Sequence, residues 1–496
     1  MTGTVYLVGA GPSDGGLFTL KGLELLRKAD VIVYDALVGL EVMALIPEKT
    51  RKINVGKRSG KHPVPQEEIN NILLREAQDG NQVVRLKGGD PFLFGRGGEE
   101  LEILADHGIP FEVVPGVTSA LAAPAYGGIP VTHRNYCSSV HIITAHTNRS
   151  PGPNYKALAQ MDGTLVFLMG MSSLNEICSN LRNSGMEPSM PAAIIEQGTS
   201  ARQRRICGTI TTLPSLAKEA SAAAPAVIVI GRVCALAERF AWAEKRPLAG
   251  KRILVTRPQA RASAMASSLR SYGAEVIELP SITPELIEPN PALDAALKEK
   301  YDWLALTSPT GVEMLLEHFK RAKIDIRNLY GVKLAAIGSA TAERMKSFGL
   351  VVDLVPETYS GAALGKALAA QGGRVLLARA KEGSPELTEA LKEAGMEYTD
   401  IPLYKTFLAK EDMSWLEDGS IDYITFTSAS TVHGFMQRTK GRIHGLAVCI
   451  GAATERAAHS YGMETVTAKT ASIASMTELI LSLPKQARHD IVSKSK

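Results

Sequence analysis

Residues 83–100, VVRLKGGDPFLFGRGGEE, decide the fold of the first half of the chain. The stretch begins as a short apolar run, which predicts a buried strand. The run breaks at Gly88 and Gly89, where the lack of a side chain lets the backbone approach a ligand and adopt positive φ. Asp90 supplies a hydrogen-bond acceptor at the strand end, and the acidic pair at 99–100 favours the start of a helix. Two glycines alone would indicate only an ordinary strand-to-helix turn, but the whole run is far more specific.

The bulk composition is that of an ordinary globular protein. At roughly 150 residues per domain, 496 residues predict three or four domains. The formal net charge of +4 is too small to indicate a nucleic-acid partner. The five cysteines have neither metal-like nor disulfide-like spacing, which favours reduced thiols in a cytoplasmic protein. The start of the chain has no signal-peptide pattern, and no apolar run approaches the ~20 residues of a membrane span, so we expect no membrane partner.

The first two predicted strands end in residues that bear on the chemistry. Residues 5–8 run into a Gly-Ala-Gly-Pro turn, but Asp14 stands where a dinucleotide fingerprint needs its third glycine, so a nicotinamide site is disfavoured. The next strand, residues 31–34, ends in Asp35. A carboxylate at a strand end can be catalytic or can cap the following loop. Its position alone leaves both roles open.

A basic cluster comes next, interrupted by an apolar residue and a glycine at 55–56. A solvated face would explain a run of charges, but the interruption favours a loop directed at an anionic ligand. The cluster comprises Lys49, Arg51, Lys52, Lys57, Arg58, Lys61 and His62.

Six short segments of this half occur in a characteristic order and spacing. They are Gly9–Pro12, Tyr34–Asp35, Val55–Arg58, Gly88–Pro91, Pro115–Ser119 and Ile129–Arg134. With residues 83–100, they make residues 1–245 resemble the tetrapyrrole methylases, in the uroporphyrinogen-III C-methyltransferase branch. The resemblance implies two α/β domains with S-adenosylmethionine (SAM) bound in the cleft between them. It also implies a homodimer.

The resemblance assigns roles to individual residues. Asp35 resembles the family's proton acceptor and Lys57 its proton donor. Since uroporphyrinogen III carries carboxylates on every ring, basic side chains are needed to bind it, and the available ones are Arg58, Lys61, Arg96 and Arg134. The SAM site would be lined by Pro12, Gly88, Gly89, Asp90, Leu93, Thr118, Ser119, Met169 and Gly198. Two departures are tolerated: residues 11–16 read GPSDGG where relatives usually carry GPGDPD, and Ser119 stands where alanine is also common.

The second half contains an internal repeat, which begins after a charged, proline- and glycine-containing joint at residues 244–250. Residues 250–255 match residues 372–377, an offset of 372 − 250 = 122. The same offset aligns Gly273 with Gly395. A second pair of strands ends in Thr-Ser in both copies, and a Gly-x-x-Thr follows in each. We therefore predict two similar α/β units over residues 250–485. The Thr-Ser and Gly-x-x-Thr segments are typical of helix N-caps, and the free N–H groups of those helix N-termini can in addition hold carboxylates.

This half resembles uroporphyrinogen-III synthase. The resembling segments are Val255–Pro258, Thr307–Ser308, Ile337–Gly338, Ile401–Tyr404, Phe426–Ser428 and Ile450–Thr454. The resemblance implies two α/β lobes joined by a two-stranded ladder, one lobe at about 250–282 plus 403–485 and the other at about 283–402. Tyr404 matches the cleft tyrosine and is the candidate proton donor, although a tyrosine on a linking strand also often serves packing alone. The candidates to bind carboxylates are Arg257, Thr307, Ser308, Thr427, Ser428 and Thr454.

Together the two resemblances predict a fused two-step enzyme with a polar tail at 486–496 and no metal. Residues 250–485 would cyclise hydroxymethylbilane to uroporphyrinogen III with inversion of ring D. Residues 1–245 would then methylate the product at C2 and C7, with two SAM, to give precorrin-2 and S-adenosylhomocysteine (SAH). The alternative is a methylase acting on a later precorrin, fused to a non-catalytic two-lobed tetrapyrrole-binding module. Siroheme and cobalamin both remain open as end products.

Overall fold

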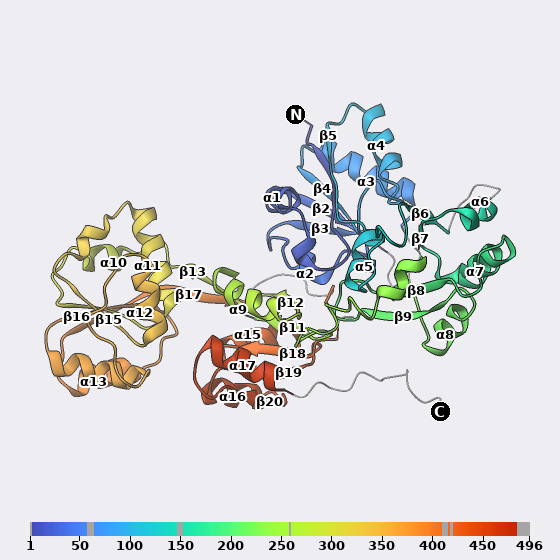
Figure 1. Ribbon diagram of the computed structural model, residues 1–496. Coiled ribbons are helices and arrows are strands. Elements are labelled where there is room, and N and C mark those ends of the chain that lie inside the picture. The colour runs from blue at the N-terminus through green and yellow to red at the C-terminus, as the bar shows by residue number, and fades with distance from the viewer. Residues whose placement is uncertain are drawn as a thin grey trace. The chain divides into compact units, whose positions relative to one another are not determined.

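The computed structural model describes residues 2–56, 64–145, 152–256, 259–408, 415–416 and 420–483, without the side chains of 259–263. The chain forms two compact units (Figure 1). Unit 1 comprises residues 1–280 and 410–496, and unit 2 comprises residues 281–409. The units are described separately below.

The first sheet of unit 1 is entirely parallel and carries the stretch 83–100. Its strands, in spatial order, are β3 (Arg51–Asn54), β2 (Val31–Tyr34), β4 (Val83–Lys87), β1 (Val5–Gly9) and β5 (Phe111–Val114). The helices of this part are α1 (Leu20–Lys28), α2 (Leu40–Met43), α3 (Gln66–Gln78) and α4 (Gly97–Asp106). Strands β2 and β4 are buried throughout, because apolar side chains cover both faces of the sheet.

The second sheet of unit 1 is mixed. Its spatial order is β6 (Val140–Thr144), β7 (Thr164–Leu168), β10 (Ala226–Ile230), β8 (Pro191–Glu196) and β9 (Arg204–Thr209). Only β6 and β7 pair in parallel, and the other three pairings are antiparallel. The helices around it are α5 (Ser119–Tyr126), α6 (Tyr155–Gln160), α7 (Leu174–Asn183) and α8 (Leu213–Glu219). The apolar runs at 140–144, 164–169, 192–196 and 226–230 predict four of these strands from the sequence, whereas β9 has no such run.

The third sheet of unit 1 is built from two distant parts of the chain. Its parallel strands are β12 (Glu275–Glu278), β11 (Arg252–Val255), β18 (Tyr423–Phe426), β19 (Leu446–Cys449) and β20 (Thr465–Thr467). The helices are α9 (Gln259–Ser271), α15 (Ala429–Thr439), α16 (Ala452–His459) and α17 (Ile473–Ser482).

Unit 2 has one sheet and an antiparallel two-stranded ladder at its edge. The sheet order is β13 (Ile282–Leu286), β17 (Tyr398–Leu408), β16 (Val375–Ala380), β14 (Trp303–Leu306) and β15 (Lys333–Ala336). Strand β13 pairs antiparallel with the second half of β17, from Leu286 opposite Tyr404 to Ile282 opposite Leu408. The helices are α10 (Pro291–Ala296), α11 (Pro309–Ala322), α12 (Ser339–Lys346), α13 (Gly361–Gln371) and α14 (Glu386–Glu393).

The third and fourth sheets share one topology, which confirms the predicted pair of similar lobes. The order β12-β11-β18-β19 in unit 1 corresponds to β17-β16-β14-β15 in unit 2. A bridge between Ala335 and Leu354 takes the place of the pairing of β19 with β20. In unit 2 the strand pair β16 and β17 is the copy of β11 and β12 at the 122-residue offset. The predicted α/β fold class, two-lobed in the first half and paired-lobed in the second, is confirmed.

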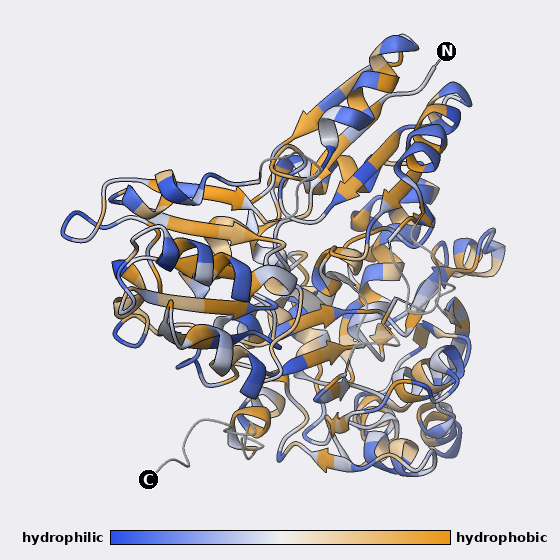
Figure 2. Ribbon diagram, turned by 90° about the vertical axis from the view of Figure 1, so that its right-hand side faces the viewer, coloured by the Kyte–Doolittle hydropathy of each residue, from blue (hydrophilic) through white to orange (hydrophobic). Residues whose placement is uncertain are grey.

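Hydrophobic residues concentrate on the strands, and hydrophilic residues on outward faces of the helices (Figure 2). Among the helices that the structure describes, none is long and apolar enough to cross a membrane.

Candidate active sites

The loops after β1 and β4 are joined backbone to backbone. The amide of Gly11 donates to the carbonyl of Gly89 at 3.2 Å, and Gly89 donates back to Gly11 at 2.8 Å. Asp90 fixes the same region, because its carboxylate accepts from the amides of Phe92 (2.8 Å), Leu93 (3.1 Å) and Gly116 (3.0 Å). The bond from Gly116 therefore holds the loop to the segment after β5, and the bonds from Phe92 and Leu93 fix the loop itself.

Glycine is required where these loops touch. A Cβ on Gly116 would lie 2.1 Å from the carbonyl oxygen of Gly89, and one on Gly9 would lie 2.5 Å from Gly116. Gly89 has φ +69°, in the left-handed region. A Cβ on Gly88 would lie 2.6 Å from the Cβ of Leu37, so the turn after Asp35 lies against the glycine pair.

The second sheet contributes the loop after β8 to the same neighbourhood. The amide of Asp14 donates to the Thr199 hydroxyl at 3.2 Å. A Cβ on Gly198 would lie 2.5 Å from the Cβ of Ala123 in α5, whose first residue is Ser119. Gln197 and Thr199 both have positive φ, as does Met169 at the end of β7, and such strain clusters at functional sites.

The structure thus brings the predicted cofactor residues of both sheets to connected loops around the start of α5. Thr118 is the N-cap of α5 and accepts from the amide of Ala120 at 3.2 Å. Leu93 packs against a buried cluster that also adjoins Leu168, next to the half-exposed Met169. Pro12 lies between Gly11, bonded to Gly89, and Asp14, bonded to Thr199.

Asp35 lies at the end of β2 beside a buried group of charges. Its carboxylate accepts from the amide of Leu37 at 3.0 Å and lies 3.8 Å from the guanidinium of Arg85. Arg85 also pairs with Glu100 at 3.1 Å, and Lys87 pairs with the same oxygen of Glu100 at 2.8 Å. Asp35 caps its turn and, with its side chain 26% exposed, keeps a path to a ligand. The two roles left open by the sequence are therefore compatible.

The buried charges were not predicted, although they lie within residues 83–100. Arg85 and Lys87 alternate on one face of β4 and are only 3% and 4% exposed. Burial, followed by repulsion from Arg85, holds the pKa of Lys87 below its ordinary value, while Glu100 opposes that shift. Glu100 is fully buried, and its second oxygen has no hydrogen-bond partner among the residues that the structure describes. The sequence does contain a signal for these buried charges: two charged residues stand at alternate positions of an otherwise apolar strand.

The predicted carboxylate-binding residues of this half are only partly described. Arg96 is exposed and forms a two-bond ion pair with Glu99, at 2.9 and 2.6 Å. Arg134 is exposed. Lys57, Arg58 and Lys61 lie outside the described residues.

In unit 2 the candidate proton donor Tyr404 is bonded to another predicted residue. Its hydroxyl lies 3.1 Å from the Ser308 hydroxyl, although the two residues are 96 positions apart. Ser308 is also the N-cap of α11 and accepts from the amide of Gly311 at 2.9 Å. Tyr404 is 7% exposed. Thr307 precedes Ser308 at the end of β14, so three predicted residues lie at one end of this sheet.

The equivalent strand end in unit 1 holds Thr427 and Ser428. Ser428 is the N-cap of α15 in a capping box with Thr431. Gly451 is the N-cap of α16, and Thr454 lies in its first turn with 3% exposure. The Gly-x-x-Thr segment was predicted as a helix cap, and it is the glycine, without a side-chain bond, that occupies the cap position. Arg257 lies outside the described residues.

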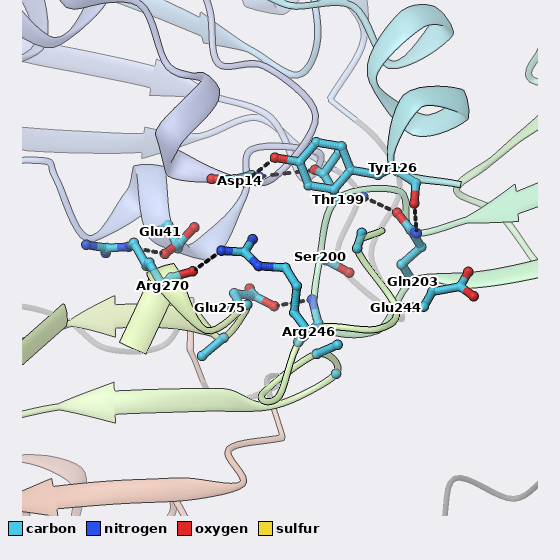
Figure 3. Close-up of a pocket in the computed structure, with 16 residues that line it drawn as sticks. Asp14, Glu41, Tyr126, Thr199, Ser200, Gln203, Glu244, Arg246, Arg270 and Glu275 are labelled. Carbon is cyan, nitrogen blue, oxygen red and sulfur yellow. Dashed lines mark hydrogen bonds and ion pairs between the residues drawn. The ribbon is translucent and has the colours of Figure 1, made fainter. Parts of the chain in front are cut away.

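A small cavity of about 80 Å³ lies within unit 1, lined in part by Asp14 and Thr199 of the loops that carry Pro12 and Gly198 (Figure 3). Glu41, Arg270 and Glu275 line it. No local pattern in the sequence singles out these residues, because Glu41 reaches Arg270 from 229 positions away. Within the described ranges, no group of three or more His, Cys, Asp or Glu side chains could hold a metal ion.

Comparison with known proteins assigns the two halves separately. Residues 4–214 match the family of tetrapyrrole (corrin/porphyrin) methylases, and residues 263–478 match uroporphyrinogen-III synthase HemD. Both resemblances stated from the sequence are thereby confirmed.

Individual relatives cover either the whole chain or about half of it. Siroheme synthase 2 from Cronobacter sakazakii is 52% identical over 48% of this chain, which spans only 52% of that relative. A uroporphyrin-III C-methyltransferase structure from Thermus thermophilus, complexed with S-adenosyl homocysteine, covers 47% of this chain and 93% of its own at 39% identity and TM-score 0.41. A mutant uroporphyrinogen III synthase from the same species covers 46% of this chain and 97% of its own at 22% identity and TM-score 0.33.

One relative matches from end to end. The porphyrin biosynthesis protein HemD of Ruminiclostridium josui is 44% identical over 97% of this chain and 98% of its own length. The chain therefore belongs to the family of this porphyrin biosynthesis protein, with a tetrapyrrole methylase region followed by a uroporphyrinogen-III synthase region.

Proposed function

We propose that the chain catalyses two consecutive steps of tetrapyrrole biosynthesis. Residues 250–485 convert hydroxymethylbilane to uroporphyrinogen III, with inversion of ring D. Residues 1–245 then methylate uroporphyrinogen III at C2 and C7, consuming two SAM and giving precorrin-2. The observation that carries the second step is the contact of the Asp35 turn with the glycine pair, because it sets a carboxylate beside the proposed cofactor loop.

The loops after β1, β4 and β8 fit a bulky cofactor such as SAM. A Cβ on Gly89 would have only the Ser119 amide nitrogen within reach, at 4.0 Å, so a ligand can approach the main chain closely there, while Gly88 and Gly116 let the loops pack against Leu37 and Gly89. When bound, SAM supplies an electrophilic methyl group. The loops hold donor and acceptor in line, which is the main contribution a protein makes to a displacement of this kind.

In the methylation step Asp35 accepts the proton that the ring system must lose. Arg85 lies beside it and is itself held by Glu100 and by two backbone carbonyls, of Val33 (3.4 Å) and Leu86 (3.1 Å). The orientation of the Asp35 carboxylate is therefore supported by two neighbouring strands. Arg96, Arg134 and the basic residues at 57–61 bind substrate carboxylates.

In the cyclisation step Tyr404 donates a proton to the departing hydroxyl of the bilane. The Ser308 hydroxyl holds the phenol in place at 3.1 Å. Thr307, Thr427, Ser428 and Thr454 bind carboxylates at the ends of β14 and β18 and in the first turn of α16, where helix N-termini favour negative charge.

The remaining features of the proposal are the lobe boundaries, the compartment and the oligomeric state. The synthase lobes comprise residues 250–280 with 410–485, and residues 281–409, so the second crossing lies a few residues after the position 402–403 expected from the sequence. The enzyme acts in the cytoplasm as a homodimer formed through its methylase part.

The test supplies purified protein with hydroxymethylbilane, with and without SAM, and separates the oxidised porphyrins. We expect the type III isomer without SAM and its replacement by a dimethylated product with SAM. Type I isomer alone, which forms spontaneously, would contradict the synthase activity and favour a binding module. Type III isomer that SAM leaves unchanged would mean that the methylase region uses another acceptor.

A further inference from the structure

The buried carboxylate of Glu41, in α2, connects the proposed SAM loop to the synthase lobe of unit 1. One of its oxygens accepts from the amide of Gly15 at 2.9 Å. The other accepts from Arg270 Nε at 2.7 Å and from the amide of Val276 at 3.0 Å (Figure 3). Glu41 is 5% exposed, so these bonds are shielded from water. One side chain thus joins the 12–16 loop to α9 and β12.

A second buried carboxylate belongs to the synthase lobe and connects it to the loop after β8. Glu275, in β12 and 7% exposed, accepts from the amide of Ala201 at 2.8 Å. Arg252 holds Glu275 from the synthase side at 3.1 Å. Ala201 follows the loop that contains Gly198, the predicted cofactor residue of the second sheet. Strand β12 therefore contacts the loop after β8 directly and reaches the 12–16 loop through Glu41.

The two loops are also tied to one another, so they respond together. Asp14 donates through its amide to Thr199 at 3.2 Å and accepts from the Tyr126 hydroxyl at 2.5 Å. The amide of Thr199 donates to Gln203 at 2.7 Å, and Gln203 donates to the carbonyl of Tyr126 at 3.1 Å. Figure 3 shows these side chains around the cavity.

Each of the three guanidinium nitrogens of Arg270 forms a hydrogen bond. Besides Glu41, its guanidinium bonds Glu278 at 2.8 Å and the carbonyl of Val276 at 2.7 Å. Ala44, which ends α2, lies in the same apolar cluster as Leu254 and Ile277 of the synthase lobe. The hydrogen bonds of Arg270 therefore lie beside a packed apolar cluster, which fixes their geometry.

We propose that the synthase lobe completes the SAM site of the methylase part, with Arg270 and Glu275 as positioning residues for its two loops. This rests on the proposed SAM site. The loop at 12–16 contains two adjacent glycines and only a short 3₁₀ turn (Gly15–Leu17), so left alone it would lose much freedom when it binds a ligand. The carboxylates of Glu41 and Glu275 order the two loops before the ligand binds. Less conformational entropy is then lost on binding, which strengthens it.

The test measures SAH binding to the full chain by isothermal titration calorimetry. Arg270→Met keeps the length of the side chain but removes its bonds to Glu41, and we expect the dissociation constant of SAH to rise roughly tenfold, within the usual range for coupled sites. Arg270→Lys keeps the charge next to Glu41 and should recover part of the affinity. The steady-state KM for SAM should rise in parallel, with kcat little changed.

Arg379→Met is the matched control. Arg379 is also a buried arginine with a two-bond carboxylate partner, Asp400 at 2.9 and 2.6 Å, but it lies in unit 2. Arg379→Met should lower the melting temperature and leave the affinity for SAH within twofold of that of the wild type. If Arg270→Met also leaves SAH affinity unchanged, the contact is only structural and the inference is wrong.

A measurement on the unmodified protein covers the case in which Arg270→Met does not fold. SAH should slow hydrogen exchange at the Val276 amide, which donates to Glu41. Unchanged exchange at Val276 in a protein that does bind SAH would overturn the inference. A wild type that fails to bind SAH at all would instead contradict the proposed function.

Discussion

The guanidinium of Arg85 lies 3.8 Å from the carboxylate of Asp35. Arg85 is almost fully buried in β4, whereas the Asp35 side chain at the end of β2 is a quarter exposed. The ion pair therefore joins the buried charges to the one carboxylate of the group that a ligand can reach. This relationship distinguishes Asp35 from an ordinary loop cap and leads to the first two predictions.

Replacing the proposed proton acceptor should slow methylation without preventing cofactor binding. Asp35→Asn keeps an oxygen for the Leu37 amide but cannot take up a proton, so the turnover number should fall by about 10²- to 10⁴-fold. Precorrin-2 formation and SAH binding are the two measurements. Asp106→Asn, at an exposed position that ends α4, should match the wild type in both. An Asp35→Asn enzyme with wild-type turnover would exclude Asp35 as the acceptor.

The buried lysine should make stability depend on alkaline pH. The pKa of Lys87 in the folded chain lies below 10.5, its ordinary value, because of burial. Between that lowered pKa and 10.5 the unfolded chain binds more protons, so the Lys87 contribution to the free energy of unfolding rises with pH. The gain is about 1.4 kcal/mol for each unit of pKa shift.

Urea unfolding of the wild type and of Lys87→Met across this window measures the effect, since other titrating groups cancel in the difference. The wild type should gain stability relative to Lys87→Met as the pH approaches 10.5. A difference that stays constant or shrinks would show that Lys87 is not held below its ordinary pKa.

The close approach of the glycine loops should be intolerant of a single methyl group. Gly116→Ala would place a Cβ 2.1 Å from the Gly89 carbonyl oxygen, so both loops must move apart. We expect a loss of roughly 1–3 kcal/mol in stability and a much weaker affinity for SAH, seen by chemical unfolding and by calorimetry. Gly98→Ala, in α4 with open space around it, should instead stabilise by about 0.5–1 kcal/mol. Normal SAH binding by Gly116→Ala would place the cofactor elsewhere.

The synthase step should depend on the hydroxyl of Tyr404. Tyr404→Phe preserves packing but removes the proposed proton donor and its bond to Ser308, so type III isomer formation should slow by about 10²-fold. The ratio of type III to type I isomer is the measurement, since spontaneous closure gives type I. Tyr330→Phe, 95% exposed in the same unit, is the control.

Ser308→Ala tests the hydroxyl that both positions Tyr404 and caps α11. It leaves the phenol without its partner and removes the N-cap bond to Gly311, which should cost about 1 kcal/mol of stability. A rate loss with Tyr404→Phe no greater than with Tyr330→Phe would make Tyr404 a packing residue.

Features with a local signal could be predicted from the sequence. The loops around Gly88 and Gly89, the N-cap at Ser308 and the 122-residue repeat all follow from glycine spacing, turn chemistry or self-similarity. The strand β9 was missed because two arginines open it, and its second residue, Arg205, is recognisable as buried only once Glu238 and Glu244 are seen to pair with it.

Long-range contacts had no such signal. Glu41 in a four-residue helix reads as a surface acid, and only the fold brings it to Arg270, 229 positions away. Arg85 likewise reads as a strand interruption until Glu100 is placed beside it. The partners of charged side chains depend on topology, which a periodicity analysis does not supply.

The shared topology of the third and fourth sheets also has a bearing on how the gene arose. In chain order, β11, β12, β14 and β15 make one complete copy of the repeat, and β16, β17, β18 and β19 make the next. Yet each sheet takes its first strand pair from one copy and its second pair from the other. The two copies of a tandem duplication have therefore exchanged halves, as in a domain-swapped dimer whose subunits became a single polypeptide. Because each sheet of this half is completed by strands of both copies, the evolutionary unit differs from the folding unit.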